Sequence, residues 1–531
     1  MALRAAEEDG TAPHARGAAI SHNQSFGIDA RPPPVPAAPI PTTFMLSLTK
    51  SRMAVLLAGL FIAGYFIYEA RLSLRAKFTH DDLMNCALAV REPLSHLVAG
   101  CIVFFGFPET YRPMGELVYR AAYSVSGLNL LPLRVFLLVV MGLNIYLAYC
   151  FARRLTLSRE VAVLTALFSA YHLNLAAYYF NTGMIYDILC FFFYFSAAVY
   201  YLRIRQAGRM LRWYELLVFC GLYALALDSK ELAVSLPVLV GAYELFFNPP
   251  PPRLAAVFRW SYRELAPVWI TALMTAAYIP GRVMAPGAVG TTVGYKMTVS
   301  LAVYLARTSR YLDDLFYVEK YFDNPRTLAF LLMLLLGAII FRSRKLAVCW
   351  LLFVTGILPM AFLWPRGLTA VWIPVAGLLV YAAIAAVSLR DAMLRLLRRK
   401  NWQPAGQVAL FVLAACFMLR VHPDSRSMYE AWQPEYNSIR DVRVSLAQFC
   451  PTMPKGSKIL FVTDPLNGTY STVFLVHLLY HDSALQVDQL FRFDKKPDAE
   501  TLAKYDYVFD FVKGKLVRLD PKEYARRASG T

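Results

Sequence analysis

The chain has 531 residues, a mean hydropathy of +0.44, 58% hydrophobic residues and only 17% charged residues. Soluble globular proteins carry about a quarter charged residues, so this composition excludes an ordinary soluble protein and indicates a polytopic membrane protein. The formal net charge is +18, but the basic residues recur in short clusters between apolar runs, which is typical of membrane topology. We therefore expect the lipid bilayer as a partner and no nucleic acid.

The N-terminal residues 1–50 are rich in Ala and Pro and show no apolar periodicity, which predicts a disordered tail. The first apolar run begins near Met53. A removable signal peptide would begin near residue 1, so we expect this run to be a retained first membrane helix.

Apolar runs near the roughly 17–25 residues that a bilayer requires fill residues 51–420. They lie near 51–70, 131–151, 160–178, 184–202, 213–228, 231–247, 264–280, 325–341, 346–364, 367–388 and 404–420. The sequence thus predicts an all-α polytopic membrane module of about 11 transmembrane helices. Two further apolar stretches, 94–107 and 297–318, leave the count open by one or two.

The loops between these runs alternate in charge, with Arg and Lys clusters after every second run. Cytoplasmic loops carry the basic excess, so we expect a cytoplasmic N-terminus. Residues 71–130, a large first external loop, are then extracytoplasmic, as are 281–324 and the C-terminal 421–531. Arg71, Arg75 and Lys77 run against this rule, and one explanation is a functional demand for cations there.

The polar residues 421–531 predict a small extracytoplasmic α/β domain. Lys458–Asp464 has the pattern of a buried strand, and Ser471–Tyr480 that of a helix. Tyr505–Phe511 predicts a second strand, which Lys513-Gly514 would end in a turn.

Asp81 and Asp82 lie about ten residues beyond the first span, in the first external loop. Neighbouring carboxylates repel, and a partly buried one has a raised pKa that suits a general base. The plainer interpretation is a helix N-terminus, in which Thr79, Asp81 or Asp82 caps a helix through 83–90.

Two other polar clusters and two single charged residues fall in the same predicted outer layer. The first, in 109–120, contains Arg112, either an ordinary i,i+4 partner of Glu116 or an anion ligand. The second is the short turn 228–231, where Lys230 and Glu231 are either hydrated or functional. The others are Asp187 and Arg366. Together they predict a polar cavity that opens outward and holds both carboxylates and cations.

No metal site is predicted. The eight cysteines show no ligand spacing. His477 and His481 have a metal-ligand spacing, but an exposed helix face explains them more simply.

These motifs resemble the GT-C superfamily of polytopic glycosyltransferases. Within it, the chain looks most like the membrane part of the tetratricopeptide-containing O-mannosyltransferases, near the protein O-mannosyltransferase group. The similar residues are Asp81-Asp82, Tyr111-Arg112-Pro113-Met114 with Arg120, Gly127-Leu128-Asn129 and Ser229-Lys230-Glu231. No tetratricopeptide array follows, and the relatives' Glu-Arg and Pro motif is present only as Arg366 and Pro374.

The resemblance implies a sugar donor carried on a polyprenyl phosphate and an acceptor hydroxyl on a protein, glycan or lipid. It implies transfer with inversion at the outer face of a membrane, for which we expect the bacterial inner membrane. Asp81 or Asp82 would be the catalytic base, and Arg112, Lys230, Glu231, Arg366 and Asp187 would bind substrate or phosphate. Some members of the superfamily use a divalent cation, and the sequence does not decide whether this chain does.

Two other classes of protein fit part of the pattern. A transporter or lipid flippase also has polar groups in the membrane, but it is expected to show paired repeats and ionisable groups near the midplane. A scaffold protein with a degenerate site is the other alternative, against which the acidic and basic clusters argue.

Overall fold

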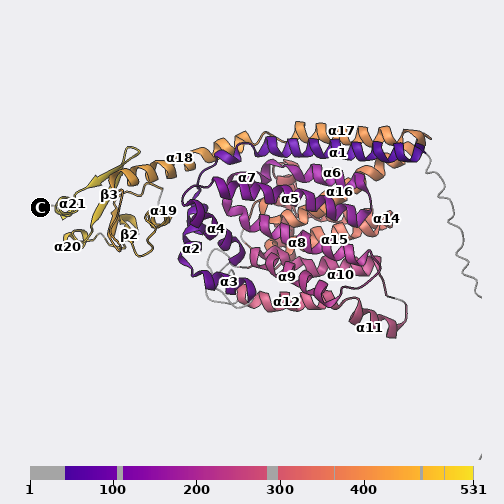
Figure 1. Cartoon of the computed structure of the whole chain (residues 1–531), viewed down its shortest axis with the longest axis horizontal. Helices are drawn as coiled ribbons and strands as arrows, with labels where there is room; N and C mark the ends of the chain where they lie inside the picture. The colour runs from indigo at the N-terminus through magenta and orange to yellow at the C-terminus, as the bar shows by residue number, and fades with distance from the viewer. Residues whose placement is uncertain are drawn as a thin grey trace, which may run out of the picture. The chain divides into compact units, whose positions relative to one another are not determined.

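The computed structural model describes residues 42–103, 112–250, 252–283, 297–363, 365–466, 470–495 and 497–529. These residues are mostly helical, with one small sheet near the C-terminus (Figure 1). Most of the predicted disordered tail and the beginning of the predicted cluster at 109–111 lie outside the described residues.

Most helices of the chain fall between residues 42 and 421. They are α1 (Thr42–Ala70), α2 (His80–Arg91), α3 (Leu94–Ile102), α4 (Pro113–Ser126), α5 (Leu131–Thr156), α6 (Arg159–Ala170), α7 (Ala177–Phe180), α8 (Ile185–Arg205), α9 (Trp213–Ser229), α10 (Leu236–Phe247), α11 (Leu254–Arg263), α12 (Ala266–Val283), α13 (Leu301–Phe316), α14 (Asn324–Ile340), α15 (Arg344–Ala361), α16 (Trp372–Leu396) and α17 (Gln403–Val421).

Helices occupy the predicted membrane spans, and the chain is an integral membrane protein. Among the described residues, six helical stretches are long and apolar enough to cross a bilayer: Met53–Arg75, Leu131–Thr156, Thr182–Arg205, Arg344–Ala361, Leu368–Leu396 and Gln403–Phe449. A seventh helix, Asn324–Ile340, is apolar but shorter. The count of eleven spans therefore stays a prediction.

One predicted span, 160–178, is not a continuous helix. α6 ends at Ala170, and a 3₁₀ turn, Leu173–Leu175, follows before α7. Polar side chains explain the break: the His172 ring accepts a hydrogen bond from the Asn174 backbone N–H, and the Asn174 amide donates to the carbonyl of Asp314 at 2.7 Å. These bonds replace helical ones.

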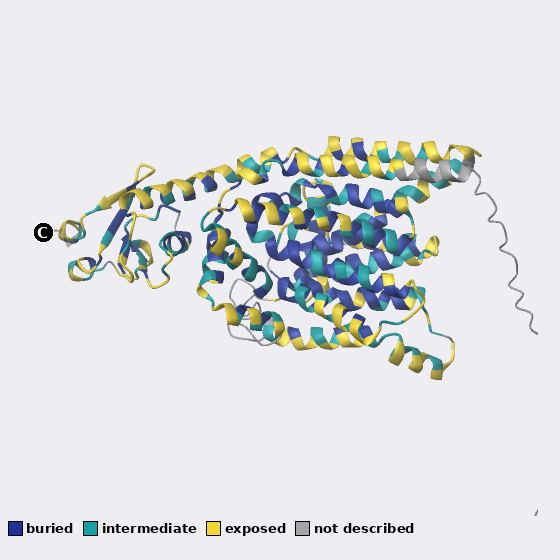
Figure 2. Cartoon of the chain, viewed as in Figure 1, coloured by how far each residue is buried: buried dark blue, intermediate teal, exposed yellow. Residues whose placement is uncertain are grey.

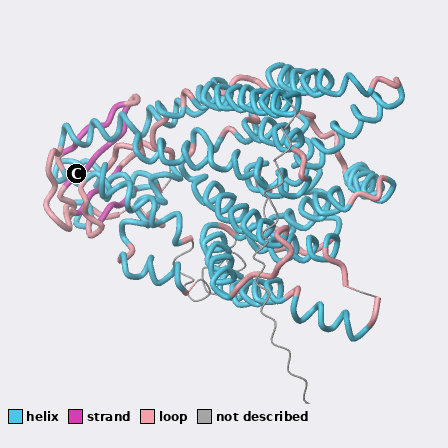
Figure 3. The backbone as a smooth tube through the Cα atoms, turned by 45° about the vertical axis from the view of Figure 1, so that its right-hand side comes forward, coloured by secondary structure: helices cyan, strands magenta, loops and turns pink. Residues whose placement is uncertain are grey.

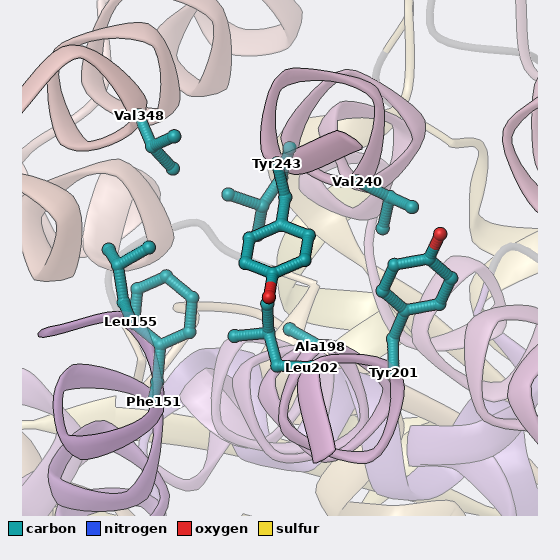
Figure 4. Close-up of a pocket in the computed structure, with 9 residues that line it drawn as sticks. Phe151, Leu155, Ala198, Tyr201, Leu202, Val240, Tyr243 and Val348 are labelled. Carbon is teal, nitrogen blue, oxygen red and sulfur yellow. The ribbon is translucent and has the colours of Figure 1, made fainter. Parts of the chain in front are cut away.

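The buried residues concentrate where α5, α8, α15 and α16 pack against one another (Figure 2). Aromatic rings fill this core: the Phe151 and Phe195 centroids lie 5.1 Å apart, and those of Phe191 and Trp372 lie 4.2 Å apart. Figure 4 shows a small apolar cavity beside Phe151, Tyr201 and Tyr243. Its volume is about 10 Å³, no more than one water needs, so it is a packing defect.

α1 and α17 run side by side along the module (Figure 1). The rings of Phe61 and Phe411 meet edge to face, with centroids 5.8 Å apart. The first and last predicted spans are therefore neighbours, and the chain leaves the module beside the place where the first external loop begins.

The C-terminal residues form a region of strands and helices, here named the C-terminal domain (Figure 3). Its elements are α18 (Arg426–Phe449), β1 (Lys458–Phe461), α19 (Ser471–Leu479), β2 (Gln486–Gln489), α20 (Ala499–Leu502), β3 (Tyr507–Val512), β4 (Lys515–Leu519) and α21 (Pro521–Ser529). The strand order is β2-β1-β3-β4, with β1 parallel to both neighbours and β3 antiparallel to β4. Lys513 and Gly514 both have positive φ, 49° and 78°, which makes the predicted turn a two-residue hairpin loop.

Candidate active site

The predicted helix after the first span is α2, and Thr79 caps it. The Thr79 hydroxyl accepts a hydrogen bond from the Asp82 N–H at 3.2 Å, and Asp82 Oδ2 accepts one from the Thr79 N–H at 2.9 Å. This reciprocal capping box satisfies two backbone donors at the helix start. The plainer interpretation of the sequence, a capped helix, is therefore confirmed for Thr79 and Asp82.

Asp82 is fully buried. Its Oδ1 accepts hydrogen bonds from the hydroxyls of Tyr119, at 3.3 Å, and Thr182. Burial raises the pKa of the Asp82 carboxyl above its ordinary value, against the lowering effect of the Arg134 guanidinium and of the hydrogen bonds from Thr182 and Thr79. Every oxygen of this carboxylate is engaged by protein groups.

Arg134 is the residue that sequence reasoning missed here. It lies in the first turns of α5, is 1% exposed, and its Nη2 approaches Asp82 Oδ2 to 3.9 Å. Its guanidinium donates to the carbonyls of Lys77 and Tyr179 at 3.2 Å and of Phe180 at 2.7 Å. The sequence did contain a signal for Arg134: it is an arginine inside an apolar run, and a charge in such a place requires partners.

Asp81 differs from its neighbour because its side chain is exposed. It lies in the first turn of α2, where the helix dipole favours a negative charge. A Cβ on Gly183 would lie 3.3 Å from the Asp81 Cβ and 2.8 Å from Asn181 Oδ1. The turn before α8 thus approaches Asp81 closely.

Four of the predicted site residues form two ion pairs. Lys230 Nζ pairs with Asp187 Oδ1, and Arg112 Nη2 lies 3.1 Å from Glu231 Oε2. All four charges lie within electrostatic reach of the Cys190 thiol, which donates to the Lys230 carbonyl at 3.6 Å. The sequence predicted one layer for these residues, but it did not reveal that each cation has a carboxylate partner.

The Tyr186 ring lies close to Arg112 and within electrostatic range of Asp81. The Arg112 guanidinium carbon lies 5.1 Å from the centre of the Tyr186 ring, and the charges of Asp81 and Arg112 both reach its phenol. α4 can approach this ring because position 115 is glycine: a Cβ there would lie 2.3 Å from Tyr186 Cε1.

Arg366 lies near two further arginines. Arg307, Arg310 and Arg366 all act electrostatically on Tyr311, in α13. Within the described part of the chain, the buried Arg307 Nε has no hydrogen-bond partner. Sequence reasoning did not identify Arg307 and Arg310, although two arginines three apart in an apolar helix were a usable signal.

The C-terminal domain contacts the start of α2. Glu435 Oε1 accepts a hydrogen bond from the His80 N–H at 2.6 Å, and His80 Nδ1 lies 2.8 Å from Ser471 Oγ. His481 is exposed, as predicted, but it lies after the end of α19 and bonds the Tyr123 hydroxyl at 2.7 Å; His477 Nε2 lies 3.0 Å from the Leu485 carbonyl. The residue adjacent to Asp81 is therefore held from outside the membrane module.

The apolar spans define a polytopic membrane protein, whose polar residues include an exposed carboxylate and two ion pairs. Residues 108–278 match the family model described as "Dolichyl-phosphate-mannose-protein mannosyltransferase". The match confirms the predicted resemblance to the protein O-mannosyltransferase group over these residues. It includes Arg112, Asp187, Lys230 and Glu231, whereas Asp81, Asp82 and Arg366 lie outside it.

The solved structures that the chain matches include two crystal structures of the oligosaccharyltransferase of Archaeoglobus fulgidus, one in the apo form and one tethered to an acceptor peptide. Sequence identity is 12% in both, and the TM-scores are 0.47 and 0.44. The alignments cover 83% and 80% of this chain but only 64% and 63% of the archaeal protein. No curated protein matches the chain.

Proposed function

We propose that the chain is a membrane glycosyltransferase that transfers a sugar from a polyprenyl-phosphate donor to an acceptor hydroxyl, on the extracytoplasmic face and with inversion. The observation that carries this proposal is the contrast between Asp81 and Asp82. One carboxylate is exposed and the other is buried and fully hydrogen-bonded, in a chain whose residues 108–278 match a mannosyltransferase family.

Asp81 is the base in this proposal. The acceptor oxygen attacks the anomeric carbon from the side opposite the phosphate, so the new bond has inverted configuration. The bond between that carbon and the phosphate oxygen breaks, and the polyprenyl phosphate leaves with the electron pair. The acceptor proton passes to Asp81, a step of the kind that contributes about 10²–10⁴ to a rate. Asp82 holds α2 so that Asp81 keeps its position.

The cations divide between two roles. Arg112 and Glu231 keep side-chain exposures of 19% and 15%, so we assign Arg112 to the donor phosphate. Lys230 and Asp187 are 9% and 6% exposed, and we assign this pair to holding α8 against the turn 228–231. Arg366, with Arg307, would stabilise the charge that grows on the leaving phosphate.

The sugar is transferred, by analogy with the family description, from a dolichyl- or other polyprenyl-phosphate mannose to a protein, glycan or lipid. The basic loops support a cytoplasmic N-terminus, and the location we propose is the bacterial inner membrane.

Reconstitution in proteoliposomes tests the function. Polyprenyl phosphate carrying a radiolabelled mannose is supplied on the side that holds the C-terminal domain, together with a membrane extract as acceptor. We expect label to move to the extract only with the protein present. Movement of the labelled lipid between leaflets without transfer would instead identify the chain as a transporter or flippase.

A further inference from the structure

A cavity of about 440 Å³ lies apart from the residues of the proposed reaction. Its wall is formed by the chain after α1, the turn before α5, and the helices α18 and α19 of the C-terminal domain. The volume is within the roughly 300–1,000 Å³ typical of pockets that hold small-molecule ligands. None of Asp81, Arg112, Lys230 and Arg366 lines it.

The cavity lies at one end of each of two candidate membrane spans. The first span, Met53–Arg75, ends beside the lining residue Leu74, and the second begins at the lining residue Leu131. Leu74 and Leu131 are 44% and 47% exposed, so the rim presents apolar side chains to the surroundings. Deeper in, Ala76, Phe78, Ile439 and Leu475 are buried.

Three cations line the same cavity: Lys77, Arg440 and Arg443. Arg443 donates to the carbonyl of Leu128 at 3.2 Å, and Arg440 pairs with the exposed Asp441 at 2.8 Å. Within the described residues, neither Lys77 nor Arg443 takes part in an ion pair, and Asp441 is the one carboxylate paired with these three. The cavity therefore carries a positive excess beside apolar side chains.

The cavity gives a reason for one of the cations, among Arg71, Arg75 and Lys77, that lie in a predicted external loop although basic residues are expected in cytoplasmic loops. Arg71 is accounted for locally, because its Nη2 lies 2.8 Å from Asp424 Oδ2. Lys77 has no such partner among the described residues, and it lines the cavity. Cations clustered at a membrane boundary are the usual means of binding anionic lipid headgroups.

We propose that this cavity binds the phosphate headgroup of an anionic glycerophospholipid of the bilayer. The headgroup phosphate lies among Lys77, Arg440 and Arg443, and the acyl chains leave over Leu74 and Leu131. The site is distinct from the proposed donor site, and it adjoins the segment 74–78 that leads into the capped start of α2.

The test uses the full-length protein, purified in a neutral detergent and incubated with phosphatidylglycerol or phosphatidylcholine. Native mass spectrometry then counts the lipids retained. The triple variant Lys77→Gln, Arg440→Gln, Arg443→Gln is compared with a control of equal charge change, Arg426→Gln, Lys495→Gln, Lys513→Gln. These control residues are exposed and lie outside the cavity.

We expect wild type and control to retain one phosphatidylglycerol that the triple variant binds roughly tenfold or more weakly. Phosphatidylcholine is not retained. Equal retention by the triple variant, or equal retention of phosphatidylcholine, would overturn the proposal.

Displacement of the bound lipid by equimolar inorganic phosphate would show that a free anion is the occupant. Displacement of the bound lipid by equimolar polyprenyl phosphate would identify the cavity as the donor site. Either result contradicts the proposal, and none of these readouts depends on transferase activity.

Discussion

Arg134 Nη2 lies 3.9 Å from Asp82 Oδ2, and the two side chains are 1% and 0% exposed. The pair joins the first turns of α5 to the first turn of α2, and Arg134 also bonds three backbone carbonyls. Buried charges persist only where such partners compensate their desolvation. This arrangement fixes the helix that carries Asp81.

Replacing Arg134 should destabilise the protein more than replacing an exposed arginine. In Arg134→Met, three backbone carbonyls lose a donor and Asp82 loses its cation, at a cost of roughly 3 kcal/mol or more. The control Arg420→Met changes an exposed residue of α17 and should have little effect. Thermal unfolding in detergent measures both, and equal unfolding midpoints would contradict the structural role of Arg134.

The raised pKa of the Asp82 carboxyl should be visible in the pH dependence of the protein's stability. Burial raises the pKa of its carboxyl in the folded protein, so the folded state binds this proton more tightly than the unfolded chain does. Protonation of Asp82 then favours folding, and its contribution is lost as pH rises through the folded pKa. From about pH 4, the ordinary Asp value, towards neutral pH, the unfolding midpoint of wild type should fall relative to that of Asp82→Asn. Parallel pH profiles would show that Asp82 has no such shift.

The Lys230–Asp187 pair allows a double-mutant test. Lys230→Met alone leaves a buried carboxylate without its cation and should cost about 3 kcal/mol. The double variant Lys230→Met, Asp187→Leu removes both charges, and its stability should return to within about 1 kcal/mol of wild type. Additive losses would show that the two residues act separately.

Much of the fold was predictable because apolar runs and strand patterns report burial directly. The helices at 51–70 and 131–151 follow from this signal, as does β1, which fills the first four residues of the predicted strand 458–464. The clustering of Asp187, Lys230 and Arg112 was predictable only as a shared layer, since topology places residues in depth but does not pair them. The anchors of α2, Arg134 and Glu435, were not found, because each makes its contacts with residues far away in the sequence.

His80 is expected to act as a positioning residue that links the C-terminal domain to Asp81. His80→Ala and Ser471→Ala each remove the 2.8 Å contact between the two side chains, and each should lower kcat about tenfold without changing KM for the donor. Because this contact is lost in both, the loss in the double variant should be smaller than the product of the two single losses. Multiplicative losses would contradict the link, and Lys495→Gln in the same domain serves as the control.

The central claim is that Asp81 takes the proton from the acceptor. The most direct measurement is the transfer rate of Asp81→Asn in proteoliposomes, beside Glu430→Gln, which changes an exposed carboxylate of α18. We expect Asp81→Asn to insert and fold normally while transfer falls by about 10²–10⁴, with the control unchanged. Transfer by Asp81→Asn within twofold of wild type would contradict the assignment.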